Sequence, residues 1–143
     1  CTIFNKNDTS LVFHTGDISL PKSLLAFKKL NCPLIAVIGN NDIEEKDGLL
    51  KAAKEFDCRI HDEPFSIDLE NKKILILHHP ELISEEISRS HDLILHGHTH
   101  RYRLEKQNDC LIFNPGECAG IMKGKNQIGI IDLKNLTPRL INF

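Results

Sequence analysis

The chain has 143 residues, of which 41% are hydrophobic and 27% charged, and its formal net charge is -2 with histidine neutral. This length suffices for one domain with a hydrophobic core but not for two ordinary domains. The balanced charge argues against nucleic acid as the main partner, because phosphate backbones are bound by basic surfaces. No apolar run approaches the ~20 residues of a membrane-spanning helix. We therefore expect a single domain over residues 1–143 that does not act at a membrane.

The five cysteines form no Cys-x-x-Cys pair, and their number is odd. A disulfide framework normally uses an even number of cysteines, so this pattern favours a reducing compartment. We expect a cytoplasmic protein, and the sequence leaves a homo-oligomer open.

Apolar runs and helical patterns alternate along the chain. After an apolar run at 11–13, a helix is predicted over 19–30, with Ser19 as its N-cap and Pro21 in its first turn. The further predicted elements, in chain order, are a strand at 34–38, a helix at 44–56, a hairpin of 65–69 with 74–77, a helix at 81–90, a strand at 93–95, and two hairpins, 102–106 with 110–113 and 127–133 with 139–143. Continuous apolar runs are typical of strands buried on both faces, so the order predicts an α/β layered domain.

Four of the apolar runs end in side chains that can bind a metal ion. These ends are His14-Thr15-Gly16-Asp17, Gly39-Asn40-Asn41-Asp42, His78-His79-Pro80 and His96-Gly97-His98-Thr99-His100. Ligands of α/β proteins bind at the carboxyl ends of the strands, so we expect these side chains to converge. A carboxylate, an amide oxygen and imidazoles together suit a divalent ion such as Mn, Fe, Ni or Zn.

The last of these segments has the strongest metal-binding pattern. His98 and His100 are two residues apart, so they point the same way if the backbone is extended. Gly97 allows a tight turn or a close approach to a ligand.

The ordered set of motifs resembles the calcineurin-like metallophosphoesterases, and more narrowly their small prokaryotic phosphodiesterase branch of the YfcE type, to which the retromer subunit Vps29 is related. The motifs that carry the resemblance are Gly16-Asp17, Gly39-Asn40-Asn41-Asp42, His78, Gly97-His98-Thr99-His100 and Asn114-Pro115-Gly116-Glu117. The resemblance covers the chain from about residue 2 onward and implies a four-layer αββα sandwich with mixed sheets.

The resemblance also implies roles for individual residues. Asp17 would bridge two divalent metal ions, with Mn²⁺ expected first and Ni, Fe or Zn as alternatives. Asn40, His78 and His98 would complete one metal site, and His100 would bind the other ion alongside Asp17. A hydroxide between the two cations would form near neutral pH, since metals lower the pKa of bound water, and would attack a small phosphoester substrate, preferably a phosphodiester.

His98 and His100 are therefore expected to be catalytic as well as metal-binding. The Asn114-Pro115-Gly116 turn would line the pocket in this branch.

The chain departs from the family pattern in two places. Larger members carry a histidine after the ligand asparagine, where this chain has Asn41, and an amide cannot donate a proton at neutral pH. We expect Asn41 to assist catalysis by hydrogen bonding and to favour substrates with good leaving groups. The family also opens with a strand that ends in Asp-x-His, and no such motif precedes Asp17. Thr2-Ile3-Phe4 is interpreted as the end of an element whose start is absent, so we expect an N-terminal truncation and little turnover by these 143 residues.

Simpler roles exist for several of these residues. Asp17 could cap the following helix, the Asn40-Asn41 pair could form a turn, and His78 could be a core histidine. His79 is expected to be a neighbour of the site rather than a ligand. The other histidines outside the motifs, His14, His61, His91 and His96, are expected to be structural or to lie on the surface.

Two classes of function follow from the resemblance. The first is a metal-dependent phosphoesterase, and the second is a non-catalytic, Vps29-like scaffold that binds partner proteins. We favour the enzyme, because a scaffold under no chemical demand could have lost the ligand residues.

Overall fold

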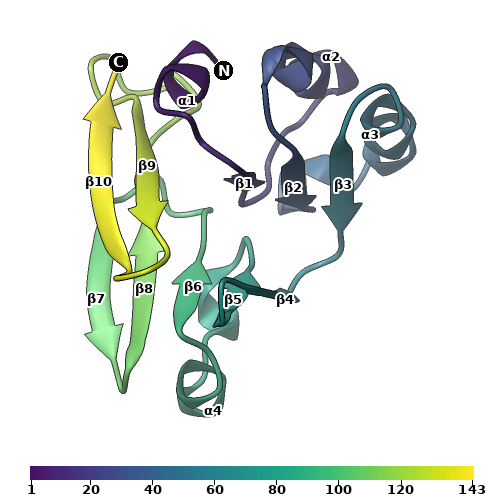
Figure 1. Ribbon diagram of the computed structural model, residues 1–143. Coiled ribbons are helices and arrows are strands. Elements are labelled where there is room, and N and C mark those ends of the chain that lie inside the picture. The colour runs from purple at the N-terminus through teal and green to yellow at the C-terminus, as the bar shows by residue number, and fades with distance from the viewer.

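The computed structural model describes residues 1–143 and stacks two β-sheets face to face, with helices on the outer face of each (Figure 1). The helices are α1 (Thr2–Lys6), α2 (Pro21–Leu25), α3 (Lys46–Ala53) and α4 (Glu85–Arg89), with 3-10 turns η1 (Ala26–Lys29), η2 (Asn40–Asp42) and η3 (Pro80–Leu82). The strands are β1 (Val12–His14), β2 (Leu34–Val37), β3 (Cys58–His61), β4 (Phe65–Leu69), β5 (Lys72–Ile76), β6 (Leu93–Leu95), β7 (Arg103–Gln107), β8 (Cys110–Asn114), β9 (Gln127–Asp132) and β10 (Thr137–Asn142). This order of layers confirms the predicted αββα sandwich.

One sheet is parallel and the other is mixed. The parallel sheet has the order β1-β2-β3, and the mixed sheet has the order β4-β5-β6-β8-β7. In the mixed sheet β5, β6 and β8 run parallel, whereas the outer pairs β4–β5 and β7–β8 are antiparallel hairpins. Strands β9 and β10 form a separate antiparallel pair. The three hairpins predicted from the sequence are confirmed.

Three hydrophobic clusters fill the spaces between the four layers. Leu34 and Ala36 of β2 face the helices α2 and α3, whereas Val37 of the same strand faces the second sheet. Strand β5 divides in the same way, since Ile74 and Ile76 belong to the cluster between the sheets. Leu75 packs in a third cluster with Ile87 of α4. Because successive side chains of a strand point to opposite faces, a continuous apolar run is what a strand between two layers requires.

Several predicted boundaries were wrong. The single helix predicted over residues 19–30 is instead the short helix α2 followed by the 3-10 turn η1. The N-cap of α2 is Leu20 and not Ser19, because Ser19 has a left-handed φ of 69°. The helix predicted over 44–56 is shortened to α3, and the helix over 81–90 is split into η3 and α4. Residues 2–6 form helix α1, which the sequence pattern did not predict, and β3 was also missed.

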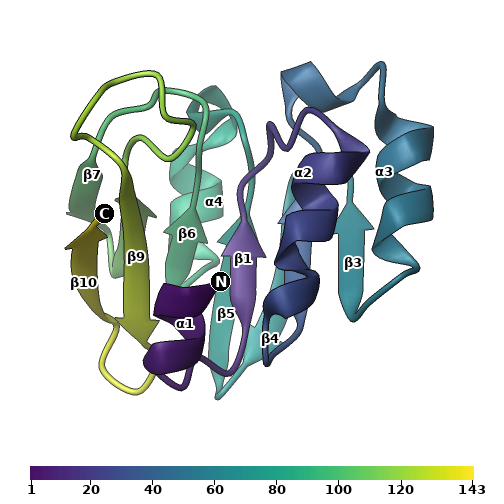
Figure 2. The same ribbon diagram turned by 90° about the horizontal axis from the view of Figure 1, so that it is seen from above.

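A large cavity lies beside the edge of the parallel sheet. Strand β1 pairs only with β2, and β9 pairs only with β10. Figure 2 shows α1 and β9 on one side of β1 and helices α2 and α3 on the other. The cavity of about 790 Å³ is lined by residues of β1 and β9 and reaches the loops that follow β1 and β6.

No helix of the protein is both long and apolar enough to cross a membrane.

Candidate metal centre

Four predicted metal ligands meet where four strands end. Asp17 lies in the loop after β1, Asn40 begins η2 after β2, His78 follows β5, and His98 lies in the loop after β6. All four strands run into the same edge of the sandwich, because β1 and β2 are parallel and so are β5 and β6. We call Asp17, Asn40, His78 and His98 the four-donor centre.

The donor atoms of Asn40, His98 and Asp17 each lie close to the Nε2 atom of His78. The Nε2 atom of His78 is 3.0 Å from Oδ1 of Asn40, 3.1 Å from Nδ1 of His98 and 3.4 Å from Oδ2 of Asp17. Nδ1 of His98 is 3.1 Å from Oδ1 of Asn40. Two donor atoms that bind one cation at roughly 2.0–2.2 Å are about 3.0–3.4 Å apart when they are neighbours in the coordination shell. These separations therefore fit a single divalent ion.

The hydrogen bonds of His78 fix which ring nitrogen is available to a metal. Its Nδ1 lies 2.7 Å from the backbone oxygen of Thr15, and a carbonyl oxygen can only accept. The proton of a neutral His78 ring is therefore on Nδ1, and the lone pair is on Nε2, among the other donors. A histidine that binds metal commonly donates its second N–H to a carbonyl in this way. His78 is 1% exposed, so the ring is held in place by packing as well.

Glycines allow the loops of the centre to approach one another closely. A Cβ atom on Gly39 would lie 2.4 Å from both N and Oδ1 of Asp17, and one on Gly97 would lie 2.8 Å from the backbone oxygen of Thr15. Gly16 has a φ of +90°, and a Cβ there would meet Nδ1 of His78 at 2.7 Å. Side chains at these positions would push the loops that carry the predicted ligands apart.

Asp42 connects two of the ligand loops, a role that the sequence analysis did not assign. Its side chain is fully buried, and Oδ2 accepts the backbone N–H groups of Asp17 and Gly39 at 2.8 Å each. Oδ1 accepts the backbone N–H of Ser19 at 2.6 Å. Asp17 and Ser19 both have positive φ angles, of 59° and 69°. The Asp42 carboxylate holds this strained loop beside the loop that carries Asn40.

Asn41 is directed toward the ligand carboxylate. Its backbone N–H donates to Oδ1 of Asp17 at 2.9 Å, and its side-chain amide donates to Oδ2 of Asp17 at 2.8 Å. Asn41 therefore orients Asp17 and uses one of its two amide N–H groups to do so. Asp17 itself does not cap a helix, since the N-cap of α2 is Leu20.

His98 and His100 do not lie in an extended backbone, so the condition under which they would point the same way is not met. Their φ angles are 65° and 54°, so this loop is left-handed and not extended at both residues. His98 turns toward Asn40 and His78, whereas Nδ1 of His100 lies 2.7 Å from Oε2 of Glu117. The structure thus brings four of the predicted ligands together and places the His100 ring against Glu117.

Glu117 is a buried carboxylate that the sequence analysis placed in a motif without giving it a role. Its side chain is 1% exposed and accepts the backbone N–H of Ile121 at 2.9 Å in addition to its contact with His100. Burial by itself raises the pKa of Glu117, but the hydrogen bonds from Ile121 and His100 outweigh burial and hold the pKa below its ordinary value. Glu117 is therefore an anion at neutral pH and orients the His100 ring.

The depressed pKa of Glu117 leads to a prediction about acid stability. A carboxyl with a lowered folded-state pKa stabilises the fold above its unfolded pKa of about 4.5, and this contribution is lost as the pH falls through the folded value. We expect the free energy of unfolding, from urea denaturation, to fall more steeply below about pH 4.5 in the natural chain than in Glu117→Gln. Equal slopes in the two proteins would show that Glu117 does not supply this dependence.

A second carboxylate, Glu63, supports the segment that carries His78. It accepts the backbone N–H groups of His78 and His79, the latter at 2.9 Å, and it also contacts Nδ1 of His79. Burial raises the pKa of Glu63, but the hydrogen bonds from the His79 ring and from the two backbone N–H groups outweigh it and lower the pKa. The sequence analysis did not predict this residue, because it lies 15 positions before His78.

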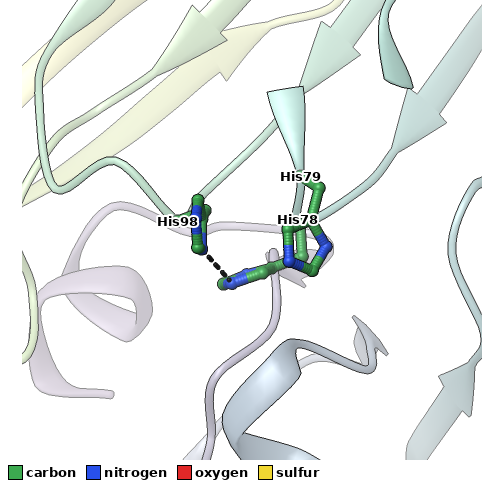
Figure 3. A group of neighbouring side chains, drawn as sticks. All are labelled: His78, His79 and His98. Carbon is green, nitrogen blue, oxygen red and sulfur yellow. Dashed lines mark hydrogen bonds between the residues drawn. The ribbon is translucent and has the colours of Figure 1, made fainter. Parts of the chain in front are cut away.

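The three imidazoles around this segment lie together, as Figure 3 shows. His78, His79 and His98 each offer one ligand atom, and these atoms are within 4.8 Å of one another. His79 is thus adjacent to the centre. Burial lowers the pKa of His14 and of His96, two histidines expected to be structural. His91 contacts Ser66 and Ile87 near the start of β6, at the opposite end of the strand from the centre.

Comparison with known proteins assigns the chain to a family. The family model described as a calcineurin-like phosphoesterase superfamily domain matches residues 2–136. Phosphodiesterase MJ0936 of Methanocaldococcus jannaschii is 35% identical over 145 residues, which cover 97% of this chain and 86% of that protein. A solved structure of an archaeal phosphodiesterase is 33% identical, with a TM-score of 0.84 over 99% of this chain and 88% of that chain.

A more distant structure, vacuolar protein sorting 29 from Cryptosporidium parvum, covers 100% of this chain and 87% of its own, with 17% identity and a TM-score of 0.63. At this identity the likeness concerns the fold alone, and a shared fold does not determine function. The family model and the 35% identical relative decide the assignment. The chain belongs to the calcineurin-like phosphoesterase superfamily.

Proposed function

We propose that this protein is a metal-dependent phosphoesterase that hydrolyses phosphodiester bonds in small substrates. The observation that carries the proposal is the four-donor centre, in which His78 Nε2 lies 3.0–3.4 Å from an amide oxygen, an imidazole nitrogen and a carboxylate oxygen. The curated relative that is 35% identical is named a phosphodiesterase, which supports the same class of substrate.

The chain supplies unequal sets of ligands for two divalent cations. Asp17, Asn40, His78 and His98 would hold one cation. Asp17 and His100 would contribute to the second, with Glu117 fixing the His100 ring. A bound divalent cation supplies Lewis-acid activation of water and neutralises phosphate charge. We infer Mn²⁺ as the activating ion, with Ni, Fe or Zn as alternatives, and tighter binding at the four-donor centre.

The protein groups of the centre suit an anionic substrate. Two imidazoles and one amide add no negative charge, and Asp17 is the single carboxylate among the four donors. With a divalent cation bound, the centre would carry a net positive charge, attract phosphate oxygens and stabilise charge that develops in the transition state. Asn41 is an amide and cannot transfer a proton at neutral pH, so it offers none to a leaving group. We therefore expect aryl esters, whose leaving groups need no proton, to be the best substrates.

A Vps29-like scaffold is the alternative on the same fold. A scaffold does not require four converged metal donors, so the four-donor centre favours the enzyme. The five cysteines are all free, which supports the expectation of a reducing compartment such as the cytoplasm.

Hydrolysis of bis(p-nitrophenyl) phosphate tests the proposal. We expect a low rate of p-nitrophenolate release, because no Asp-x-His motif precedes Asp17. This release should depend on added Mn²⁺, stop on addition of EDTA and return when Mn²⁺ is restored in excess. Metal titration by calorimetry should detect one tighter binding event. A chain that is folded by circular dichroism but binds no divalent ion would contradict the proposal and favour the scaffold.

A further inference from the structure

Glu63 fixes the orientation of a third imidazole next to the four-donor centre. One oxygen of its carboxylate accepts two backbone N–H groups, those of His78 and His79, and the other contacts Nδ1 of His79. These three contacts to Glu63 hold both the backbone of residues 78–79 and the His79 ring in place. The His79 side chain is 26% exposed, so it is reachable from the surface.

The same contact determines which nitrogen of His79 remains available. An ionised carboxylate can only accept, so the proton of a neutral His79 ring is on Nδ1. The lone pair is then on Nε2. A carboxylate that accepts the N–H of an imidazole, leaving its other nitrogen for a cation, is the usual support of a metal-binding histidine.

The distances place His79 close enough to share a cation with its neighbours. Its ring centroid is 4.7 Å from that of His78 and 4.7 Å from that of His98. The ligand atoms of the three rings are within 4.8 Å of one another. Two atoms bound to one cation at ~2.1 Å are at most ~4.2 Å apart, so a shift of less than ~1 Å would bring His79 into the shell. Figure 3 shows the three rings gathered around one space.

We propose that His79 is a further ligand of the cation at the four-donor centre and that Glu63 is its positioning residue. The resulting centre has three imidazoles, one amide oxygen and one carboxylate. This inference rests on the proposed function, because it requires a cation at that centre.

Binding of Co²⁺ to the full chain tests the inference without any measurement of activity. Co²⁺ gives visible absorption bands that report coordination, and it shifts the proton resonances of imidazoles bound to it. For His79→Gln we expect a weakening of Co²⁺ binding by about 10- to 100-fold, together with loss of one shifted, exchangeable N–H resonance. Glu63→Gln should weaken binding by roughly 10-fold and move that resonance without removing it, since the ligand itself remains.

His91→Gln is the matched control, because it removes an imidazole at the opposite end of β6, where His91 contacts Ser66 and Ile87. It should leave the Co²⁺ affinity and the shifted resonances unchanged. If the natural chain binds no Co²⁺, the four-donor centre itself is wrong. If it binds Co²⁺ and His79→Gln changes neither affinity nor resonances, the centre stands and the inference about His79 fails.

Discussion

Replacing Asp17 by alanine is expected to abolish phosphodiester hydrolysis and to weaken metal binding more than any other single change at the centre. Asp17 is the only carboxylate among the four donors, and its Oδ2 is 3.4 Å from His78 Nε2. Without it, a divalent cation would face only neutral ligands. Loss of an outer-shell partner costs roughly 10- to 100-fold in metal affinity, so removal of a charged ligand should cost at least about 100-fold. Hydrolysis of bis(p-nitrophenyl) phosphate should fall to the level without enzyme.

Asp109→Ala is the control for this change, because the Asp109 side chain is fully exposed and pairs only with Lys106 on the surface. It should match the natural chain in Mn²⁺ affinity and in rate. If Asp17→Ala folds normally yet keeps both properties, Asp17 is not a ligand and the proposed centre is wrong. If it loses metal but the natural chain hydrolyses no phosphodiester either, the metal site stands and the enzymatic function fails.

Replacing Asp42 by alanine should have the second largest effect, and it should act on stability as well as on metal binding. The fully buried carboxylate accepts three backbone N–H groups, from Asp17, Ser19 and Gly39. Each donor left without a partner costs about 1–3 kcal/mol, and because Ser19 can turn to water we expect a total of roughly 2–5 kcal/mol. The midpoint of urea denaturation should fall accordingly. Metal affinity should fall too, since the Asp17 loop loses the bonds that hold its left-handed backbone.

The conservative variant Asp42→Asn separates the two effects. Its single amide oxygen can still accept from Asp17 and Gly39, whereas the N–H₂ group would face the N–H of Ser19, so about half of the stability loss is expected. Asp109→Asn should change the free energy of unfolding by no more than about 0.5 kcal/mol, as is usual at exposed positions. Unchanged stability in Asp42→Ala would show that the connection between the loops does not depend on this carboxylate.

The elements predicted best are those in which local pattern and burial agree. Strands β2, β5 and β6 lie between two layers, so both of their faces are apolar and the run is visible in the sequence. Strand β3 was missed because it lies at the edge of its sheet and is only partly buried, and it includes the exposed Arg59. The hydrogen bonds between β3 and β2 stabilise this strand although its apolar pattern is weak. The partner of a strand cannot be predicted from the sequence of that strand alone.

The sequence by itself determined the α/β layering, the positions of the strand ends and the four donors that gather there, because apolar runs and the polar residues after them are local features. Only the tertiary structure decided how the donors are held. Asp42, Glu63 and Glu117 contact ligand segments 25, 15 and 17 residues away, and sequence spacing does not encode such contacts. The left-handed backbone at His98 and His100, which sends the two rings in different directions, likewise depends on what each ring meets across the loop.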